Sequence, residues 1–279
     1  MTAIDHIRRF HALSGRLAPG LSARYARQQL MRPRRLPPRD WEAGAAASAR
    51  RVSFRFGLSG LRWGADDAPV VLMLHGWEGR PTQFARFIAP LLAAGRQVIA
   101  LDGPAHGASP GEEANPILFA QALMEAAAEI RDLDAVVGHS MGGGAIGYAL
   151  SLGLSPRRVV LLGAPSSLRG VLDRFADEVG LLPRVRRRFL DLVHRHTGVD
   201  PDAMDIGRLA TDYDVPALVV HDRDDALVPF ADGEAMVRNW LGAELLATQG
   251  LGHWRILTDP AVVGRVVAFL TAPVLARAA

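Results

Sequence analysis

Short apolar runs recur along the chain and constrain its fold more than any other feature. They have the length of buried strands and lie at residues 70–74, 97–101, 135–137, 158–162, 217–220 and 244–247. Segments with helical periodicity follow several of these runs, at residues 82–94, 116–131, 141–152, 231–241 and 260–271. Apolar strands that alternate with helices indicate a parallel sheet covered on both faces. The sequence therefore predicts an α/β fold with a mostly parallel central sheet flanked by helices.

Two departures from this alternation predict the parts that surround the sheet. Residues 51–56 alternate in polarity and residues 61–63 resume the pattern, which predicts an antiparallel hairpin at a sheet edge. Residues 166–211 separate two predicted strands by far more than a normal crossover, and their apolar residues have helical spacing. We expect two or three helices there, forming a cap over the carboxyl ends of the strands, where open α/β sheets bind ligands. The core domain would then comprise residues 46–165 and 212–279.

Residues 1–45 differ from the rest because their arginines face few acidic residues. Ile4, Ile7 and Phe10 have roughly helical spacing, and prolines from Pro33 onward interrupt the pattern. One interpretation is a basic helical arm that binds a membrane, an anionic partner or a scaffold. The other is a helix packed on the catalytic domain with its arginines in water. We favour the second because the charge is not continuous along the segment.

The composition excludes several classes of function. All 32 basic residues are arginine, yet the net charge is only +3, which does not indicate nucleic-acid binding. The chain has no cysteine, which excludes disulfides, cysteine-ligated metals and a cysteine nucleophile. No apolar run reaches the roughly 18 residues of a transmembrane helix, and charged residues interrupt the place of a secretory signal. We expect a cytoplasmic protein without stable membrane insertion.

Residues 138–142, Gly-His-Ser-Met-Gly, contain the candidate nucleophile. They follow a predicted strand and precede a helix-compatible stretch, which is the context of a nucleophile elbow. Glycines allow the sharp turn that lifts Ser140 to its tip. The first N–H groups of the following helix, that of Met141 foremost, would point to where negative charge develops.

Residues 75–79, His-Gly-Trp-Glu-Gly, directly follow another predicted strand. This loop can offer the backbone N–H of Trp77 toward Ser140, with that of Met141 as the second donor. Two such donors are each worth about 3 kcal/mol of barrier when they face an oxyanion. We interpret His75 as a structural residue that holds the loop. Asp102 and His106, in the glycine-rich loop after the next strand, receive the same interpretation.

A serine hydroxyl needs a base to take its proton, and the base needs an acid to fix its tautomer. The best candidate base is His253, which follows the last predicted strand and is preceded by two glycines that free it to reach over the sheet end. The acid comes from residues 221–225, His-Asp-Arg-Asp-Asp, after the preceding strand. Asp222, Asp224 and Asp225 all compete for this role.

Taken together, these motifs resemble the α/β-hydrolase fold with a helical cap, over about residues 50–272. The family order of nucleophile, acid and base is matched by Ser140, the acid segment and His253. In the family the acid lies in a Gly-x-x-Asp-x-x-Val-Pro stretch. The resemblance therefore implies Asp225 as the acid, although Asp222 stands where the family has glycine. It also implies that the side chain of Trp77 borders the acyl pocket.

The resemblance implies a serine hydrolase of carboxylic esters or thioesters that works through an acyl-enzyme on Ser140, without metal or organic cofactor. We expect Trp77 and His139 to contact a small-molecule substrate. Amide, lactone or carbon–carbon bond hydrolysis is an alternative, and so is a non-catalytic protein that binds a small ligand. The arginines at 184 and 186–188 could steer anionic acyl carriers, although a solvated helix face explains them better. Oligomeric state is left open.

Overall fold

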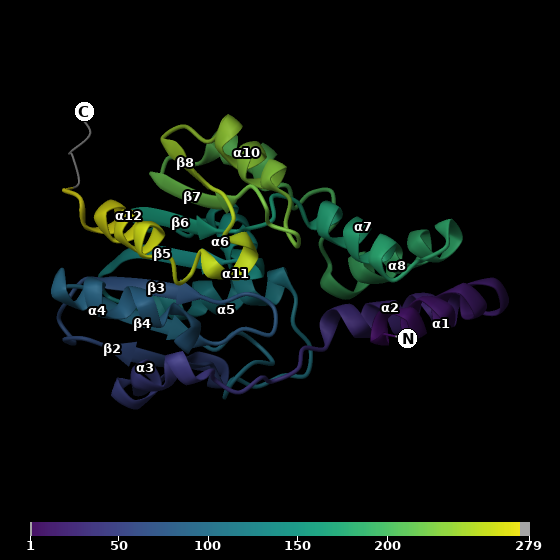
Figure 1. Cartoon of the computed structure of the whole chain (residues 1–279), viewed down its shortest axis with the longest axis horizontal. Coiled ribbons are helices and arrows are strands. Elements are labelled where there is room, and N and C mark those ends of the chain that lie inside the picture. Colours follow the sequence, from purple (N-terminus) through teal and green to yellow (C-terminus); the bar gives the residue numbers. More distant parts are fainter. Residues whose placement is uncertain (1, 274–279) are drawn as a thin grey trace.

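A computed structural model of the chain describes residues 2–273. Its centre is a single sheet of eight strands in the order β1-β2-β4-β3-β5-β6-β7-β8 (Figure 1). The strands are β1 (Arg50–Ser53), β2 (Ser59–Trp63), β3 (Val70–Leu74), β4 (Gln97–Leu101), β5 (Leu133–His139), β6 (Arg158–Leu162), β7 (Ala217–Asp222) and β8 (Ala243–Thr248). From β4 to β8 every neighbouring pair is parallel, whereas β1 and β2 form an antiparallel edge. The predicted α/β fold and the edge hairpin are confirmed.

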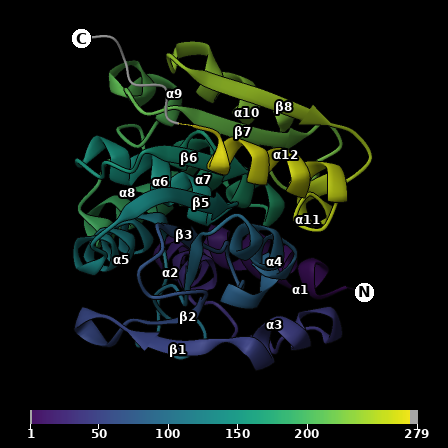
Figure 2. The same cartoon turned by 90° about the vertical axis from the view of Figure 1, so that its left-hand side faces the viewer.

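Helices cover both faces of the sheet because successive strand residues point to opposite sides. In β3, Leu72 and Leu74 face one apolar cluster, whereas Val71 and Met73 face the other. The first cluster contains α5 (Pro116–Glu129), α6 (Met141–Ser151), α9 (Ile206–Leu209) and α10 (Phe230–Asn239). The second contains α4 (Ala85–Ala93), α12 (Pro260–Thr271) and part of α3 (Ala43–Ser48). Figure 2 shows α5 and α6 on one side of the sheet and α4 and α12 on the other.

Four helices stand together outside these layers. They are α1 (Ala3–Leu17), α2 (Pro19–Met31), α7 (Leu168–Glu178) and α8 (Pro183–Thr197), and they project from one end of the sheet (Figure 1). A third apolar cluster holds them, with Ala23 and Ala26 of α2 against Leu172, Val185 and Phe189. We call these four helices the cap assembly. The first helices of the chain thus pack mainly on the segment expected to form the cap.

We keep the domain boundaries predicted from the sequence as a proposal and change only the assignment of the first two helices. We propose that α1 and α2 belong to the cap assembly and that the core keeps its two parts, 46–165 and 212–279. The last six residues of that second part lie outside the described residues. Between residues 2 and 273, no helix has both the length and the apolar character needed to cross a bilayer.

Candidate active site

Ser140 occupies a strained turn between β5 and α6. Its φ of 54° and ψ of −125° lie outside the regions that non-glycine residues favour. The turn is held because the Ser140 N–H donates to the carbonyl of Leu162, at 2.9 Å. Close packing explains the glycine two residues later, since a Cβ on Gly142 would lie 2.3 Å from the carbonyl oxygen of Leu74. The sequence thus folds here as the strand, sharp turn and helix of a nucleophile elbow.

The loop after β3 approaches Ser140 from the neighbouring strand. A Cβ on Gly76 would lie 2.7 Å from the Cβ of Ser140, so only glycine allows this approach. Within residues 2–273, no group accepts a hydrogen bond from the backbone N–H of Trp77 or of Met141. These two N–H groups are therefore available as donors on either side of Ser140.

Two buried histidines hold this loop in place. His75 accepts from the Gly103 N–H at 3.0 Å through Nε2, so its Nδ1 carries the proton that it donates to the Gly76 carbonyl at 2.7 Å. Burial lowers the pKa of His75 to about 3 and keeps it neutral. His106 accepts the Glu78 N–H at 3.0 Å. The placement of His75 and His106 agrees with the structural role expected for them.

The chain before β1 supplies two further supports for the same loop. Arg34 binds Glu78 with a bidentate pair at 2.8 and 2.7 Å, and this hydrogen bonding lowers the pKa of the Glu78 carboxyl. Glu42 is completely buried and accepts from the Arg80 Nε and the Thr82 hydroxyl, both at 2.6 Å. Sequence reasoning missed both supports, since each joins residues about forty positions apart with no local signal.

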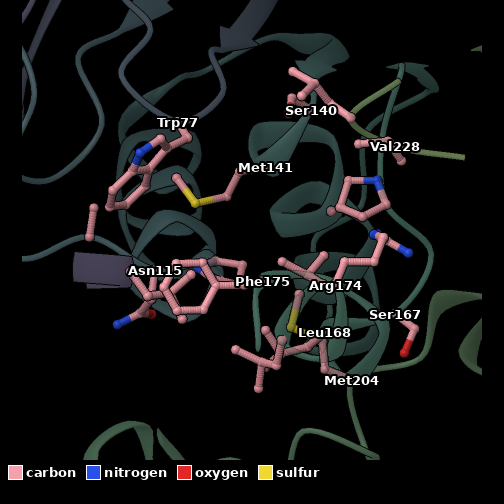
Figure 3. Close-up of a pocket in the computed structure, with 18 of the residues that line it drawn as sticks. Trp77, Asn115, Ser140, Met141, Ser167, Leu168, Arg174, Phe175, Met204 and Val228 are labelled. Carbon is pink, nitrogen blue, oxygen red and sulfur yellow. The ribbon is translucent and has the colours of Figure 1, made fainter. Parts of the chain in front are cut away.

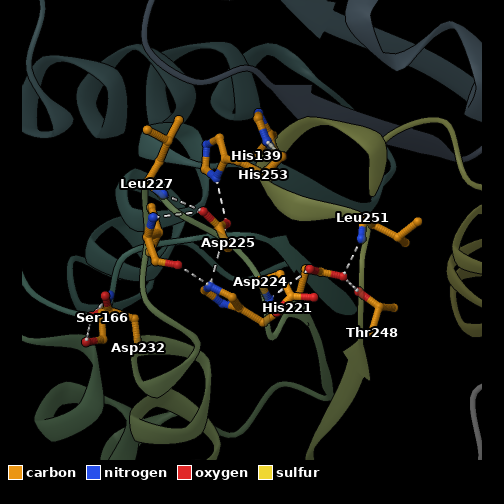
Figure 4. Close-up of polar contacts among 12 residues, drawn as sticks. His139, Ser166, His221, Asp224, Asp225, Leu227, Asp232, Thr248, Leu251 and His253 are labelled. Atoms are coloured by element: carbon orange, nitrogen blue, oxygen red, sulfur yellow. Dashed lines mark hydrogen bonds and ion pairs between the residues drawn. The ribbon is translucent and has the colours of Figure 1, made fainter.

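The candidate acid and base meet across the ends of β7 and β8 (Figure 4). Asp225 Oδ2 lies 2.7 Å from His253 Nδ1, while Oδ1 accepts the N–H groups of Leu227 and Val228, both at 2.9 Å. Burial opposes ionisation of Asp225, but the bond from His253 and those from the two N–H groups outweigh it and lower its pKa. An ionised Asp225 requires the proton of His253 on Nδ1, which leaves Nε2 as an acceptor.

The two competing carboxylates bind the loop that carries His253, whereas neither binds its ring. Asp222 accepts from the Thr248 hydroxyl at 2.7 Å and from the Leu251 N–H at 3.0 Å. Asp224 accepts from the Gly250 N–H at 2.9 Å. Of the three carboxylates left open by the sequence, only Asp225 touches the imidazole.

His139 lies behind the imidazole of His253, with the two ring centroids 4.7 Å apart. Its side chain is fully buried, and its pKa is lowered to about 3, mainly by burial. The Gln83 amide donates to Nδ1 at 3.1 Å, and Nε2 donates to the backbone carbonyl of His253 at 3.0 Å. Both ring nitrogens are therefore occupied, and the expected contact of His139 with substrate does not fit this placement. The geometry suits a residue that positions the backbone of His253.

One pocket of about 400 Å³ brings the remaining candidates together (Figure 3). Ser140, His253, Trp77 and Met141 all line it, and most of its other walls are apolar. Within residues 2–273, Ser140 Oγ makes no hydrogen bond, including none to His253. Such bonds are often long without substrate and shorten in the reacting complex. The pocket can thus bring a carbonyl carbon to Ser140 beside the imidazole.

The cap assembly supplies most of the outer wall of this pocket. Leu168, Arg174 and Phe175 of α7 project into it (Figure 3), and Gln29, Leu30 and Met31 at the end of α2 also line it. Sequence reasoning missed the α2 residues. The only available signal was the apolar pair Leu30 and Met31 at the end of a helical pattern, which does not reveal a partner.

Among residues 2–273, Arg174 is the one arginine on the pocket wall. It pairs with Asp232 at 3.2 Å, and Asp232 in turn accepts from the N–H and the hydroxyl of Ser166, at 3.1 and 2.5 Å. The pair thus fixes the loop after β6 to α7 and α10. In the described part of the chain, no group of three or more histidine, aspartate or glutamate side chains is arranged to hold a metal ion.

Comparison with known proteins gives one family match. Residues 71–266 match the model described as "Alpha/beta hydrolase family". No curated protein matches the chain.

Several solved structures are similar at low sequence identity. The Pyrococcus furiosus esterase Pf2001 is 20% identical with a TM-score of 0.62, over 86% of this chain and 98% of that one. The Rhodococcus sp. esterase RhEst1 is 20% identical with a TM-score of 0.59, over 81% and 99%. The thioesterase domain from the curacin biosynthetic pathway is 16% identical with a TM-score of 0.60, also over 81% and 99%. At these identities the likeness establishes the shared fold.

Proposed function

Because the chain belongs to the alpha/beta hydrolase family, we propose that it is a serine hydrolase that cleaves carboxylic esters or thioesters. The observation that carries this proposal is the contact of Asp225 with His253, on the wall of the pocket that also contains Ser140. The esterases and the thioesterase among the similar structures support the same class of substrate. A cytoplasmic location is part of the proposal, and cell fractionation tests it.

The first half of the reaction forms an acyl-enzyme. His253 Nε2 takes the hydroxyl proton of Ser140 as Oγ attacks the carbonyl carbon of the substrate. The developing oxyanion accepts from the N–H groups of Trp77 and Met141, which are fixed before the reaction begins. Asp225 stabilises the imidazolium, which then protonates the leaving alcohol or thiol as the tetrahedral intermediate collapses.

The second half releases the acid. Water attacks the acyl carbon while His253 takes its proton, and collapse of the second intermediate returns that proton to Ser140. The mostly apolar walls suit the acyl part of the substrate, since burial of methylene groups there is favourable. The same residues could also hydrolyse amides, lactones or carbon–carbon bonds, so reaction type requires a substrate panel.

The experiment compares wild type with Ser140→Ala on p-nitrophenyl esters and acyl thioesters of increasing chain length. Ser151→Ala is the matched control, because Ser151 lies at the exposed end of the same helix, away from the pocket, where its hydroxyl donates to the carbonyl of Tyr148. We expect Ser140→Ala to lose turnover by about a million-fold, as expected when the nucleophile of a triad is removed, and the control to retain it.

A fluorophosphonate probe separates this proposal from a non-catalytic binding protein. Covalent labelling at Ser140 in folded wild-type protein, identified by peptide mass spectrometry, would support the hydrolase. Equal turnover by wild type and Ser140→Ala would contradict it. An unlabelled Ser140 in a folded protein that binds small esters would favour the binding role.

A further inference from the structure

The hairpin formed by α1 and α2 carries large apolar side chains on its outer surface. Leu13, Leu17 and Leu21 are 65%, 77% and 58% exposed, and Phe10 and Tyr25 are more than one-third exposed. We call these five residues the hairpin face. Single exposed apolar residues are ordinary on protein surfaces, but a contiguous group marks an interaction site.

The hairpin face is contiguous across the two helices. Phe10, Leu13 and Leu17 are spaced by three and four residues and therefore share one side of α1. Leu21 and Tyr25 share one side of α2 for the same reason. The rings of Phe10 and Tyr25 meet edge to face, with centroids 4.6 Å apart, and this contact joins the two rows.

The opposite side of the hairpin packs on the rest of the cap assembly, and this packing fixes which side of the hairpin faces outward. His11 and Ser22 are buried and share a hydrogen bond of 2.8 Å between the helices. Arg184 of α8 donates to the carbonyl of Gly15 at 2.8 Å, and Ala26 is buried in the apolar cluster of the cap assembly. The hairpin projects away from the sheet (Figure 1), so the body of the protein does not cover its outer face.

Positive charge accompanies this apolar face. Residues 2–31 contain five arginines and a single acidic residue, Asp5. Arg27 pairs with Glu113, but Arg9, Arg16 and Arg24 are exposed and have no ion pair within residues 2–273. An apolar helix face with arginines beside it is the pattern of helices that lie in the interface of an anionic bilayer.

We propose that the hairpin face docks the protein on the surface of a membrane that contains anionic phospholipid. Leu13, Leu17 and Leu21 enter the boundary between headgroups and acyl chains, and Arg9, Arg16 and Arg24 bind the headgroup phosphates. A second copy of this chain is a poorer occupant, because a symmetric contact would bring the unpaired arginines of two hairpins together.

The test measures co-sedimentation with vesicles of phosphatidylcholine alone or mixed with phosphatidylglycerol. The protein carries Ser140→Ala, so that binding is measured without lipid hydrolysis and is independent of the proposed function. We expect binding to the mixed vesicles that weakens as ionic strength rises. Leu13→Gln with Leu17→Gln should lower the partition coefficient by at least about tenfold. Leu152→Gln with Leu241→Gln, which changes two exposed leucines elsewhere, should leave it unchanged.

Arg16→Gln with Arg24→Gln is a second variant that keeps the apolar face and guards against misfolding of the leucine variant. It should bind the mixed vesicles more weakly and with less salt dependence. Circular dichroism confirms that each variant is folded. The proposal is overturned if the wild-type surface does not bind mixed vesicles, or if the leucine variants bind equally well. Analytical ultracentrifugation without vesicles tests the other occupant. The proposal is also overturned if wild type is a dimer there and only the variant Leu13→Gln with Leu17→Gln is a monomer.

Discussion

Nδ1 of His253 and Oδ2 of Asp225 lie 2.7 Å apart, and both side chains are almost completely buried. A charge-assisted hydrogen bond at this depth fixes the ring orientation and the tautomer together. The neighbouring carboxylates of Asp222 and Asp224 contribute by holding the loop that carries the ring. Asp225 therefore acts on the ring itself, whereas Asp222 and Asp224 act on its loop.

Asp225→Asn should lower kcat by about 10⁴-fold, because an amide favours the wrong tautomer of the imidazole. Asp224→Asn is the control, since Asp224 is exposed and does not contact the ring. The amide oxygen of asparagine can still accept from the Gly250 N–H, as the carboxylate does. Steady-state kinetics on the best ester from the panel measures both variants. Equal losses for the two variants would remove Asp225 from the proposed triad.

Gly76→Ala should lower kcat by about 100-fold with little effect on folding. The new Cβ would stand 2.7 Å from that of Ser140, so the loop that carries the Trp77 N–H must move away. A displacement of about 1 Å at a catalytic donor is enough for a loss of this size. Gly264→Ala provides the control, because no atom of the described residues lies within 4 Å of its added Cβ outside its own helix turn. Unchanged kcat in Gly76→Ala would argue against an oxyanion role for this loop.

Acidification from pH 7 to pH 5 should destabilise the protein through its buried histidines. The pKa values of His75 and His139 are lowered to about 3, whereas an unfolded imidazole titrates near pH 6.5. Between these values the unfolded chain binds more protons than the folded chain, so stability falls as pH falls. Each histidine should account for about 2 kcal/mol over this range.

Urea unfolding at the two pH values measures this effect. The free energy of unfolding of His139→Gln should fall less between pH 7 and pH 5 than that of wild type. The difference equals the contribution of one histidine, whatever the stability of the variant at pH 7. A free energy of unfolding that does not depend on pH in wild type would contradict the assignment of neutral buried imidazoles.

Glu42→Ala should destabilise the protein by about 3–5 kcal/mol, because it leaves the partly buried guanidinium of Arg80 without its carboxylate. Glu244→Ala removes the carboxylate of an exposed pair with Arg265 and should cost less than about 1 kcal/mol. Urea unfolding followed by circular dichroism compares the two. Similar small losses would show that the Glu42 pair does not hold the loop at residues 75–79.

Prediction from the sequence succeeded best where the local apolar pattern of a segment agrees with the layers that pack around it. The predicted runs 70–74, 97–101 and 158–162 coincide with β3, β4 and β6. A strand of a sheet covered on both faces buries all its side chains, and a continuous apolar run meets this requirement. Motifs placed just after such strands necessarily gather at one edge of a parallel sheet. Ser140 and His253 therefore share a pocket, as their positions in the chain suggested. Their catalytic roles stay predictions.

Two aspects of the site depended on distances that spacing does not encode. Asp222, Asp224 and Asp225 lie within four residues, and only the turn after β7 decides which carboxylate faces the imidazole. His139 stands beside the candidate nucleophile in sequence, yet the pleat of β5 turns its ring to the opposite side, toward Gln83.

The contribution of α1 and α2 to the cap assembly could not be predicted, for a different reason. For residues 1–45 we favoured a helix packed on the catalytic domain over a basic arm. Small residues such as Ala23 and Ala26 instead allow α2 to pack closely on α8 of the cap assembly. That partner lies far along the chain, and helical periodicity identifies the apolar side of a helix without identifying what covers it.

The end of α2 has a consequence for how this protein would respond to a ligand. Leu30 and Met31 line the pocket and also belong to α2 of the hairpin. A molecule that fills the pocket therefore stabilises the packing of the chain's first two helices. Local unfolding of the hairpin and loss of affinity are then linked by mass action. Shortening the chain at its start would remove one side of the pocket, even though every residue around Ser140 remained in place.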